Sequence, residues 1–291
     1  MSRFRFISEH RAVFGVKRLC RVLKVSRSGF YAWLAGIPKR AGRVADDNRL
    51  LEQIQAIHRQ TGGAYGSPRV TVELHAQGVV VNHKRVERLM RQHGVVGIHL
   101  RRGRKTTIPS PAAITIPDLL GRDFTATAPD RRWVGDITYL RAGTSWLYLA
   151  TVVDLYSRRL VGWSLTNHLR AELVIDALDS AVTTRGRVDG VVFHADHGAQ
   201  YTSAAFAQAC ATHQVVQSMG RIGDSYDNAV AESFFATLKR ELGCRFDSAD
   251  QARLAVFSWI AFYNHRRRHS ALNYHSPIEY ENITTHQPAA A

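Results

Sequence analysis

After residue 130, the order of hydrophobic and polar residues first predicts a series of β-strands. Three runs rich in Val, Ile, Leu and aromatic residues follow one another closely, at 133–140, 145–153 and 159–165. Turn-forming residues separate them, with Gly143 in the first connection and Ser157 in the second. Short β-branched and aromatic runs bounded by such residues predict three strands joined by tight connections.

The pattern then alternates between helix and strand. Apolar residues recur at helical spacing over 171–185, and a further strand-like run ends at Asp196. The same two periods predict a helix over 203–213, a strand at 215–217, and helices over 228–243 and 250–264. This order predicts an α/β domain with a mixed sheet and flanking helices.

The N-terminal part shows only the helical period. Residues 14–34 predict two short helices around a break, the second beginning at Ser26 or Ser28 with Phe30 and Trp33 facing inward. That arrangement is typical of a helix-turn-helix.

A second such unit follows. Ser67 is predicted to cap one helix that stops at Gly78, and Asn82 to cap another that runs to Gly94. A basic second helix suits a DNA groove or backbone, although an ordinary three-helix packing unit without DNA contact is the alternative. The basic face of this helix consists of Lys84, Arg85, Arg88 and Arg91.

The net charge of +15 lies entirely at the N-terminal end. Residues 1–105 contain 22 Lys or Arg and 6 Asp or Glu, whereas residues 106–291 contain 17 and 18. A basic domain joined to a neutral one is typical of a protein that binds a polyanion, and a solvated surface is the alternative. Further candidates for neutralising a DNA backbone are Arg101, Arg102, Arg104 and Lys105.

Proline density places the domain boundary. Residues 106–130 contain Pro109, Pro111, Pro117 and Pro129, which favour an extended connector. We therefore predict a DNA-binding region over 1–105, in two units of about 10–50 and 51–105, a linker over 106–130 and a catalytic domain over 131–291.

Composition excludes several classes of protein. The three cysteines are scattered without a CxxC pair, which argues against a disulfide framework or a cysteine zinc site. No apolar run approaches the ~18 residues of a membrane span, and the N-terminus has no signal-peptide pattern. We expect a cytoplasmic protein.

Three carboxylates are the candidate catalytic residues. Asp136 lies within the first predicted strand, Asp196 follows the fourth, and Glu232 lies near the start of a predicted helix. Oxygen ligands on rigid elements suit Mg²⁺ or Mn²⁺. A strand-end cap or structural ion pair is the alternative for the aspartates, and stabilisation by the helix dipole is the alternative for Glu232.

The strings around these carboxylates resemble the OrfB-type transposases of the IS3 family of bacterial insertion sequences. The resemblance extends over nearly the whole chain. Two positions depart from the usual pattern, because His197 and Gly220 stand where Arg and Ser are more common. The matching strings are Tyr65–Arg69, Gly135–Tyr139, Asp196 with Gly198 and Gln200–Ser203, Asp227–Ala229, Glu232, Lys239, Tyr263–Asn264, Arg268–Ser270 and Ser276–Pro277.

This resemblance implies a ribonuclease-H-like fold, the integrase catalytic core, in which the first and fourth strands are neighbours. It implies two Mg²⁺ ions, replaceable by Mn²⁺, with Asp136 bound to both and Asp196 and Glu232 to one each. The implied activity is nicking of insertion-sequence ends and transfer of the 3′-hydroxyl to another DNA strand. Lys239 would contact a DNA phosphate.

The implied partners are the terminal repeats and target DNA, the product of the preceding frame (OrfA) as a fusion or partner, and further copies of the chain on DNA. A bacterial, nucleoid-associated location follows. Two other functions stay open from the sequence, namely a non-catalytic sequence-specific DNA-binding regulator and a nuclease of the same fold that cuts without joining. Trp133 and Trp146 are both expected to pack in the core.

Overall fold

The computed structural model describes the whole chain except residues 1, 99–115, 122, 187, 221–228 and 286–291. Its internal contacts divide the chain into two units, residues 1–97 and 98–291, and each is described by itself. No helix in the described ranges is long and apolar enough to cross a membrane.

The first helices of the N-terminal unit form a small bundle. They are α1 (Arg3–Phe14), α2 (Val16–Val22) and α3 (Arg27–Ala35), and Ile7, Leu19 and Phe30 pack together in their shared core. Of the two predicted starts, Ser26 and Ser28, it is Ser26 that caps α3, since its side chain accepts a hydrogen bond from the backbone of Gly29. The sequence pattern had not predicted α1.

The second part of this unit contains α4 (Ile37–Gln60), α5 (Ser67–Ala76) and α6 (His83–Gln92). Asn82 caps α6 as predicted, by accepting a hydrogen bond from the backbone N–H of Lys84. The predicted cap at Ser67 is wrong. Gly66 holds that position, and Ser67 begins the helix with its hydroxyl 3.2 Å from Nε2 of His83. The residues buried here include Leu50, Ile54, Ile57, Val70, Leu74, Val86, Leu89 and Met90.

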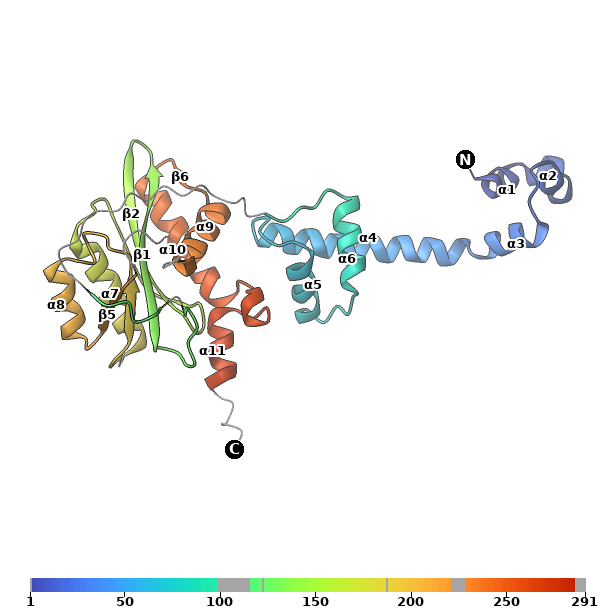
Figure 1. The fold of residues 1–291 in the computed structure, drawn as a ribbon. Helices are drawn as coiled ribbons and strands as arrows, with labels where there is room; N and C mark the ends of the chain where they lie inside the picture. Colours follow the sequence, from blue (N-terminus) through green and yellow to red (C-terminus); the bar gives the residue numbers. More distant parts are fainter. Residues whose placement is uncertain (1, 99–115, 122, 187, 221–228, 286–291) are drawn as a thin grey trace, which may run out of the picture. The chain divides into compact units, whose positions relative to one another are not determined.

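The C-terminal unit, residues 98–291, is built on a six-stranded mixed sheet (Figure 1). Five strands are hydrogen-bonded in the order β3-β2-β1-β4-β5, and β6 pairs with the far end of β1. The predicted neighbours β1 and β4 therefore lie side by side, in parallel. The strands are β1 (Arg132–Ala142), β2 (Ser145–Asp154), β3 (Leu160–Thr166), β4 (Val192–Ala195), β5 (Val216–Met219) and β6 (Arg245–Phe246).

Helices cover both faces of the sheet (Figure 1). On one face α7 (Ala171–Arg185) and α8 (Ala204–Thr212) pack against a cluster that includes Trp133 and Phe193. On the other, α9 (Ala229–Leu242) and α10 (Ala249–His265) pack against Val134 and Leu140. Since neighbouring residues of a strand point to opposite faces, these two clusters fix which side chains of β1 face α9.

β1 can lie close to the side chain of Phe193 on β4 because residue 135 is a glycine. A Cβ atom built there would lie 2.3 Å from Cζ of Phe193. That ring is itself held by Tyr201 and Phe206, whose ring centres are 5.9 and 5.3 Å away. Strand β1 therefore needs a glycine at the position immediately before Asp136.

A C-terminal helix, α11 (Pro277–Thr285), completes this unit and had not been predicted. Glu281 attaches it to the β2–β3 turn, accepting hydrogen bonds from the hydroxyl of Ser157 at 2.6 Å and from Arg159 at 2.7 Å. Arg185 of α7 forms an ion pair with the same carboxylate. Asp154, fully buried beside them, accepts from the backbone and hydroxyl of Ser157.

The predicted linker is described only from residue 116. Its first part lies outside the described residues, whereas Leu120 is buried in the cluster beneath α9 and α10 and Phe124 packs against that cluster. The backbone of Leu119 also donates to the hydroxyl of Ser218 on β5. This stretch is thus packed on the sheet.

Candidate active site and nucleic-acid interface

Asp136 and Asp196 lie level with one another on the same face of the sheet. The parallel register pairs Val134 of β1 with His194 of β4, and each aspartate lies two residues further along its chain. Even-numbered positions of β1 face α9, because Val134 and Leu140 pack with that helix. Asp136 is partly buried, whereas Asp196 is exposed.

Glu232 is supplied by the first turn of α9, above this face. Phe234 and Leu238 bury the inner side of the helix and leave Glu232 exposed beside them. At the other end of α9, the buried carboxylate of Glu241 accepts hydrogen bonds from Arg267 at 2.7 Å and from Trp259 at 3.1 Å. Removing either partner of such a buried pair is costly, so this contact fixes the helix that carries Glu232.

The three carboxylates are close enough for their charges to interact. Burial, together with the negative charges of Asp196 and Glu232, raises the pKa of Asp136 to about 7. The N–H of Ile137, which donates to Asp136 at 2.7 Å, and the charge of Lys239 act in the opposite direction. A carboxylate in such surroundings gains from a nearby cation.

The chemistry of these donors fits a hard divalent ion, which prefers carboxylate oxygens. As they stand, however, no three His, Cys, Asp or Glu side chains of the described residues are grouped closely enough to hold a metal ion. Asp136, Asp196 and Glu232 would have to approach one another to share one. Like charges resist that approach until a cation offsets them.

The side chain of Lys239, in the last turn of α9, contacts Tyr139 of β1. Its Nζ lies 4.7 Å from the centre of the Tyr139 ring, and burial lowers its pKa. The charge of Asp136 acts on Lys239 in the opposite direction. The predicted contact of Lys239 with DNA stays a prediction, but the residue does lie beside the carboxylates.

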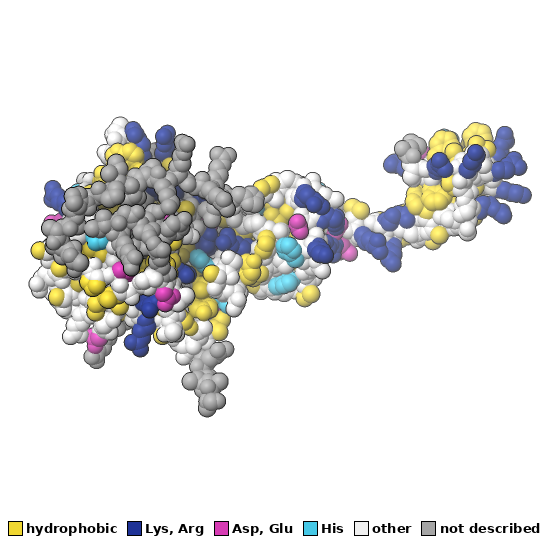
Figure 2. Space-filling view, viewed as in Figure 1, with side chains coloured by type: hydrophobic (Ala, Val, Ile, Leu, Met, Phe, Trp, Pro, Cys, Tyr) yellow, Lys and Arg dark blue, Asp and Glu magenta, His cyan; other side chains and the backbone are white. Residues whose placement is uncertain are grey.

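The residues predicted to bind DNA differ in their surroundings. On α6, Lys84 and Arg91 are exposed. Arg85 and Arg88 instead form ion pairs of 2.7 and 2.8 Å with Asp47 of α4. Arg101, Arg102, Arg104 and Lys105 lie outside the described residues. Figure 2 shows Lys and Arg side chains gathered over the N-terminal helices and along α4.

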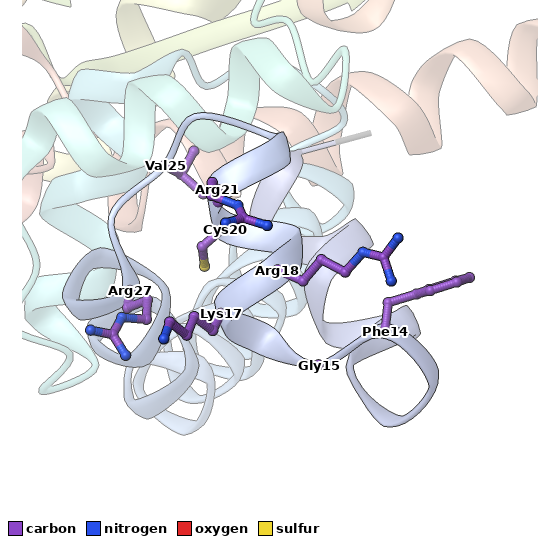
Figure 3. Close-up of a pocket in the computed structure, with 8 residues that line it drawn as sticks. All are labelled: Phe14, Gly15, Lys17, Arg18, Cys20, Arg21, Val25 and Arg27. Atoms are coloured by element: carbon purple, nitrogen blue, oxygen red, sulfur yellow. The ribbon is translucent and has the colours of Figure 1, made fainter.

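A basic pocket of about 670 Å³ opens among α1, α2 and the start of α3 (Figure 3). Cys20 and Val25 contribute apolar surface to this pocket. Its cationic side chains are Lys17, Arg18 and Arg21 of α2 and Arg27 of α3. Four cationic side chains around one hollow suit a phosphate group.

Comparisons with known proteins cover both units. An HTH-like domain model matches residues 45–104, and two integrase core domain models match residues 126–225 and 213–277. Transposase InsF for insertion sequence IS3A of Escherichia coli is 40% identical over 95% of this chain and 97% of its own length. The putative transposase for element IS986/IS6110 of Mycobacterium tuberculosis is 35% identical over 89% and 95%.

The chain belongs to the IS3 family of insertion-sequence transposases. Among solved structures, the HTLV-2 integrase catalytic core domain in complex with magnesium matches 53% of this chain and 98% of its own, with a TM-score of 0.42 and 17% identity. The IS3-family relatives confirm the expected family, and the two integrase core domain models together with the mixed sheet confirm the expected fold class.

The two departures from the usual IS3-family strings contact each other. Nε2 of His197 donates to the backbone carbonyl of Gly220 at 2.6 Å. His197 follows Asp196 directly, so this bond ties the segment after β4 to the segment after β5. The structure therefore accommodates both unusual residues, His197 and Gly220, through one hydrogen bond between them.

Sequence reasoning missed two features of this IS3-family transposase. The buried pair of Glu241 and Arg267 joins residues that are far apart in sequence, and no local pattern signals it. The expectation that Trp146 packs in the core is wrong, because 42% of this residue is exposed. Trp133 is fully buried as expected.

Proposed function

We propose that this transposase nicks the ends of its insertion sequence and joins the 3′-hydroxyl to another strand, with Asp136, Asp196 and Glu232 as metal ligands. The observation that supports this most strongly is the placement of these carboxylates on β1, after β4 and on α9, where their charges act on one another. Mg²⁺ or Mn²⁺ bound there would activate the attacking oxygen and stabilise the leaving one.

The chain's own residues have distinct roles in this proposal. Asp136, which comes from β1 and whose pKa responds to the charges of the other two carboxylates, would contact both ions, while Asp196 and Glu232 would each contact one. Lys239 would bind a phosphate of the DNA end. Arg267 and Glu241 would be positioning residues, because they fix α9 and through it Glu232.

The N-terminal unit would supply DNA affinity, and copies of the chain would assemble on DNA in the cytoplasm. The product of the preceding frame would contribute as a fusion or partner. A regulator without catalysis would need no carboxylates arranged in this way, and a nuclease would use the same site.

The test is an assay with a labelled duplex that carries the insertion-sequence end found beside the gene, with Mg²⁺ or Mn²⁺. The protein is used alone and fused to the upstream frame. Both nicked and joined products are expected. Nicks without joined products would favour the nuclease, and DNA binding without any metal-dependent product would favour the regulator.

Binding by the N-terminal unit is expected to depend strongly on salt. Each phosphate contact contributes about 0.9 to the slope of log affinity against log salt concentration. Lys84→Ala and Arg91→Ala should each weaken binding and lower that slope by about 1, as measured by fluorescence anisotropy across a salt series.

Arg253→Ala is the matched control, because Arg253 lies on α10 of the other unit and already pairs with Asp250. An unchanged slope in Lys84→Ala and Arg91→Ala would remove α6 from the DNA interface.

A further inference from the structure

Two large aromatic side chains are exposed at the end of the β1–β2 hairpin. Tyr139 is 58% exposed and Trp146 is 42% exposed, and their rings meet edge to face with centres 5.3 Å apart. The guanidinium of Arg141 lies 5.6 Å from the Trp146 ring centre, and Lys239 lies over Tyr139. We call Tyr139, Trp146, Arg141 and Lys239 the aromatic platform.

Local structure explains why these side chains share one surface. Tyr139 and Arg141 alternate with the buried Leu140, so both point to the same face of β1. The antiparallel register places Trp146 opposite Arg141. Lys239 reaches this surface from α9, which packs on the opposite face.

The chemistry of the aromatic platform fits nucleotides. Flat aromatic rings stack on bases, and the cations beside them suit the phosphates between those bases. Exposed apolar surface of this kind marks a site of interaction, and the two positive charges favour an anionic partner. A base is free to stack on a side chain only where the duplex is open.

We propose that the aromatic platform binds unpaired nucleotides of the DNA substrate next to the phosphate held at the three carboxylates. Asp136 and Tyr139 are three residues apart on one strand and therefore point to opposite faces of the sheet. Lys239 connects the two places, because its Nζ lies 4.7 Å from the centre of the Tyr139 ring and its charge acts on Asp136. Naming DNA as the occupant rests on the function proposed above.

The test compares a forked duplex carrying the insertion-sequence end with the fully paired duplex of the same sequence. 2-Aminopurine replaces one of the first three unpaired bases, and the full-length protein is used in EDTA so that no cleavage occurs. Affinity is measured by anisotropy and stacking by quenching of the 2-aminopurine fluorescence. Trp146→Ala and Tyr139→Ala are compared with Trp146→Phe and with Phe257→Ala, an exposed aromatic on α10.

Trp146→Ala and Tyr139→Ala are expected to lose the quenching and to weaken binding to the fork by about 10-fold, with little change for the paired duplex. Trp146→Phe should retain the quenching, and Phe257→Ala should behave as wild type. Wild-type quenching in both alanine variants, or an equal loss for fork and duplex, would overturn the proposal.

A separate cleavage assay of the wild-type protein in Mg²⁺ keeps the two proposals distinct. Cleavage together with unaltered fork binding in the alanine variants would remove the aromatic platform and leave the proposed function. Selective loss of fork binding in a protein that never cuts would remove the proposed function and leave the platform as a DNA-binding surface.

Discussion

Asp136→Asn is expected to lower metal-dependent DNA cleavage by about 10³-fold while making the metal-free protein more stable. A metal ion bound there would contribute several kcal/mol of transition-state stabilisation, and each ~1.4 kcal/mol corresponds to a factor of ten in rate. Asn keeps the shape of the side chain but removes the charge that would bind both ions.

The gain in stability follows from the pKa of Asp136, which burial and the neighbouring carboxylates raise from 3.8 to about 7. A raised carboxyl pKa means that the folded state binds the proton more tightly than the unfolded state. The stability that Asp136 contributes when protonated is therefore lost as pH rises from about 4 to about 7. Above pH 7, Asn should increase the free energy of unfolding by on the order of 2 kcal/mol, since partial exposure reduces the effect.

Thermal unfolding in EDTA at pH 5 and pH 8, beside the cleavage assay, measures both effects. The variant should melt above wild type at pH 8, by a margin that shrinks at pH 5, and added Mg²⁺ should raise the melting temperature of wild type alone. Asp176→Asn, an exposed carboxylate on α7, is the matched control. Retained cleavage in Asp136→Asn would exclude Asp136 as an essential ligand.

Glu281→Ala should destabilise the C-terminal unit by about 3–5 kcal/mol, the cost typical of breaking a buried ion pair by removing one partner. Glu281 is 6% exposed and is the common partner of Ser157, Arg159 and Arg185. Its loss removes the carboxylate that pairs with Arg159 and leaves Arg185 paired, among the described residues, only with Asp130, at 2.9 Å.

Urea denaturation followed by circular dichroism measures this effect. Asp250→Ala is the control, because the side chain of Asp250 is 95% exposed and its ion pair with Arg253 should contribute less than about 1 kcal/mol. Equal stability of Glu281→Ala and Asp250→Ala would show that α11 is not required for the fold of the C-terminal unit.

The sheet was predictable because its strands are buried on defined faces, which imposes apolar runs that a sequence displays directly. The order of elements from β1 to α10 followed from those runs and from the helical period. Helix α11 escaped because polar contacts of Glu281, made with residues more than ninety positions away, hold it in place. Short β6 has too few residues to show a period.

The three carboxylates could be picked out because each lies in a recognisable string on a predicted element. The distances between the three carboxylates could not be predicted, because they depend on how Arg267 and Glu241 fix α9. The exposure of Trp146 was also beyond the pattern. A strand period says which residues share a face, but not how far along the strand the covering helices extend.

Gly135 has a consequence for how this protein tolerates mutation. Gly135 has no side chain that could take part in the chemistry. Any side chain at this position would nevertheless collide with the Phe193 ring, which Tyr201 and Phe206 hold in place. The close spacing of β1 and β4, the strands that position Asp136 and Asp196, thus depends on the lack of a side chain at position 135. In a saturation library selected for transposition, position 135 should therefore be as depleted of substitutions as position 136, although only the latter carries a reactive group.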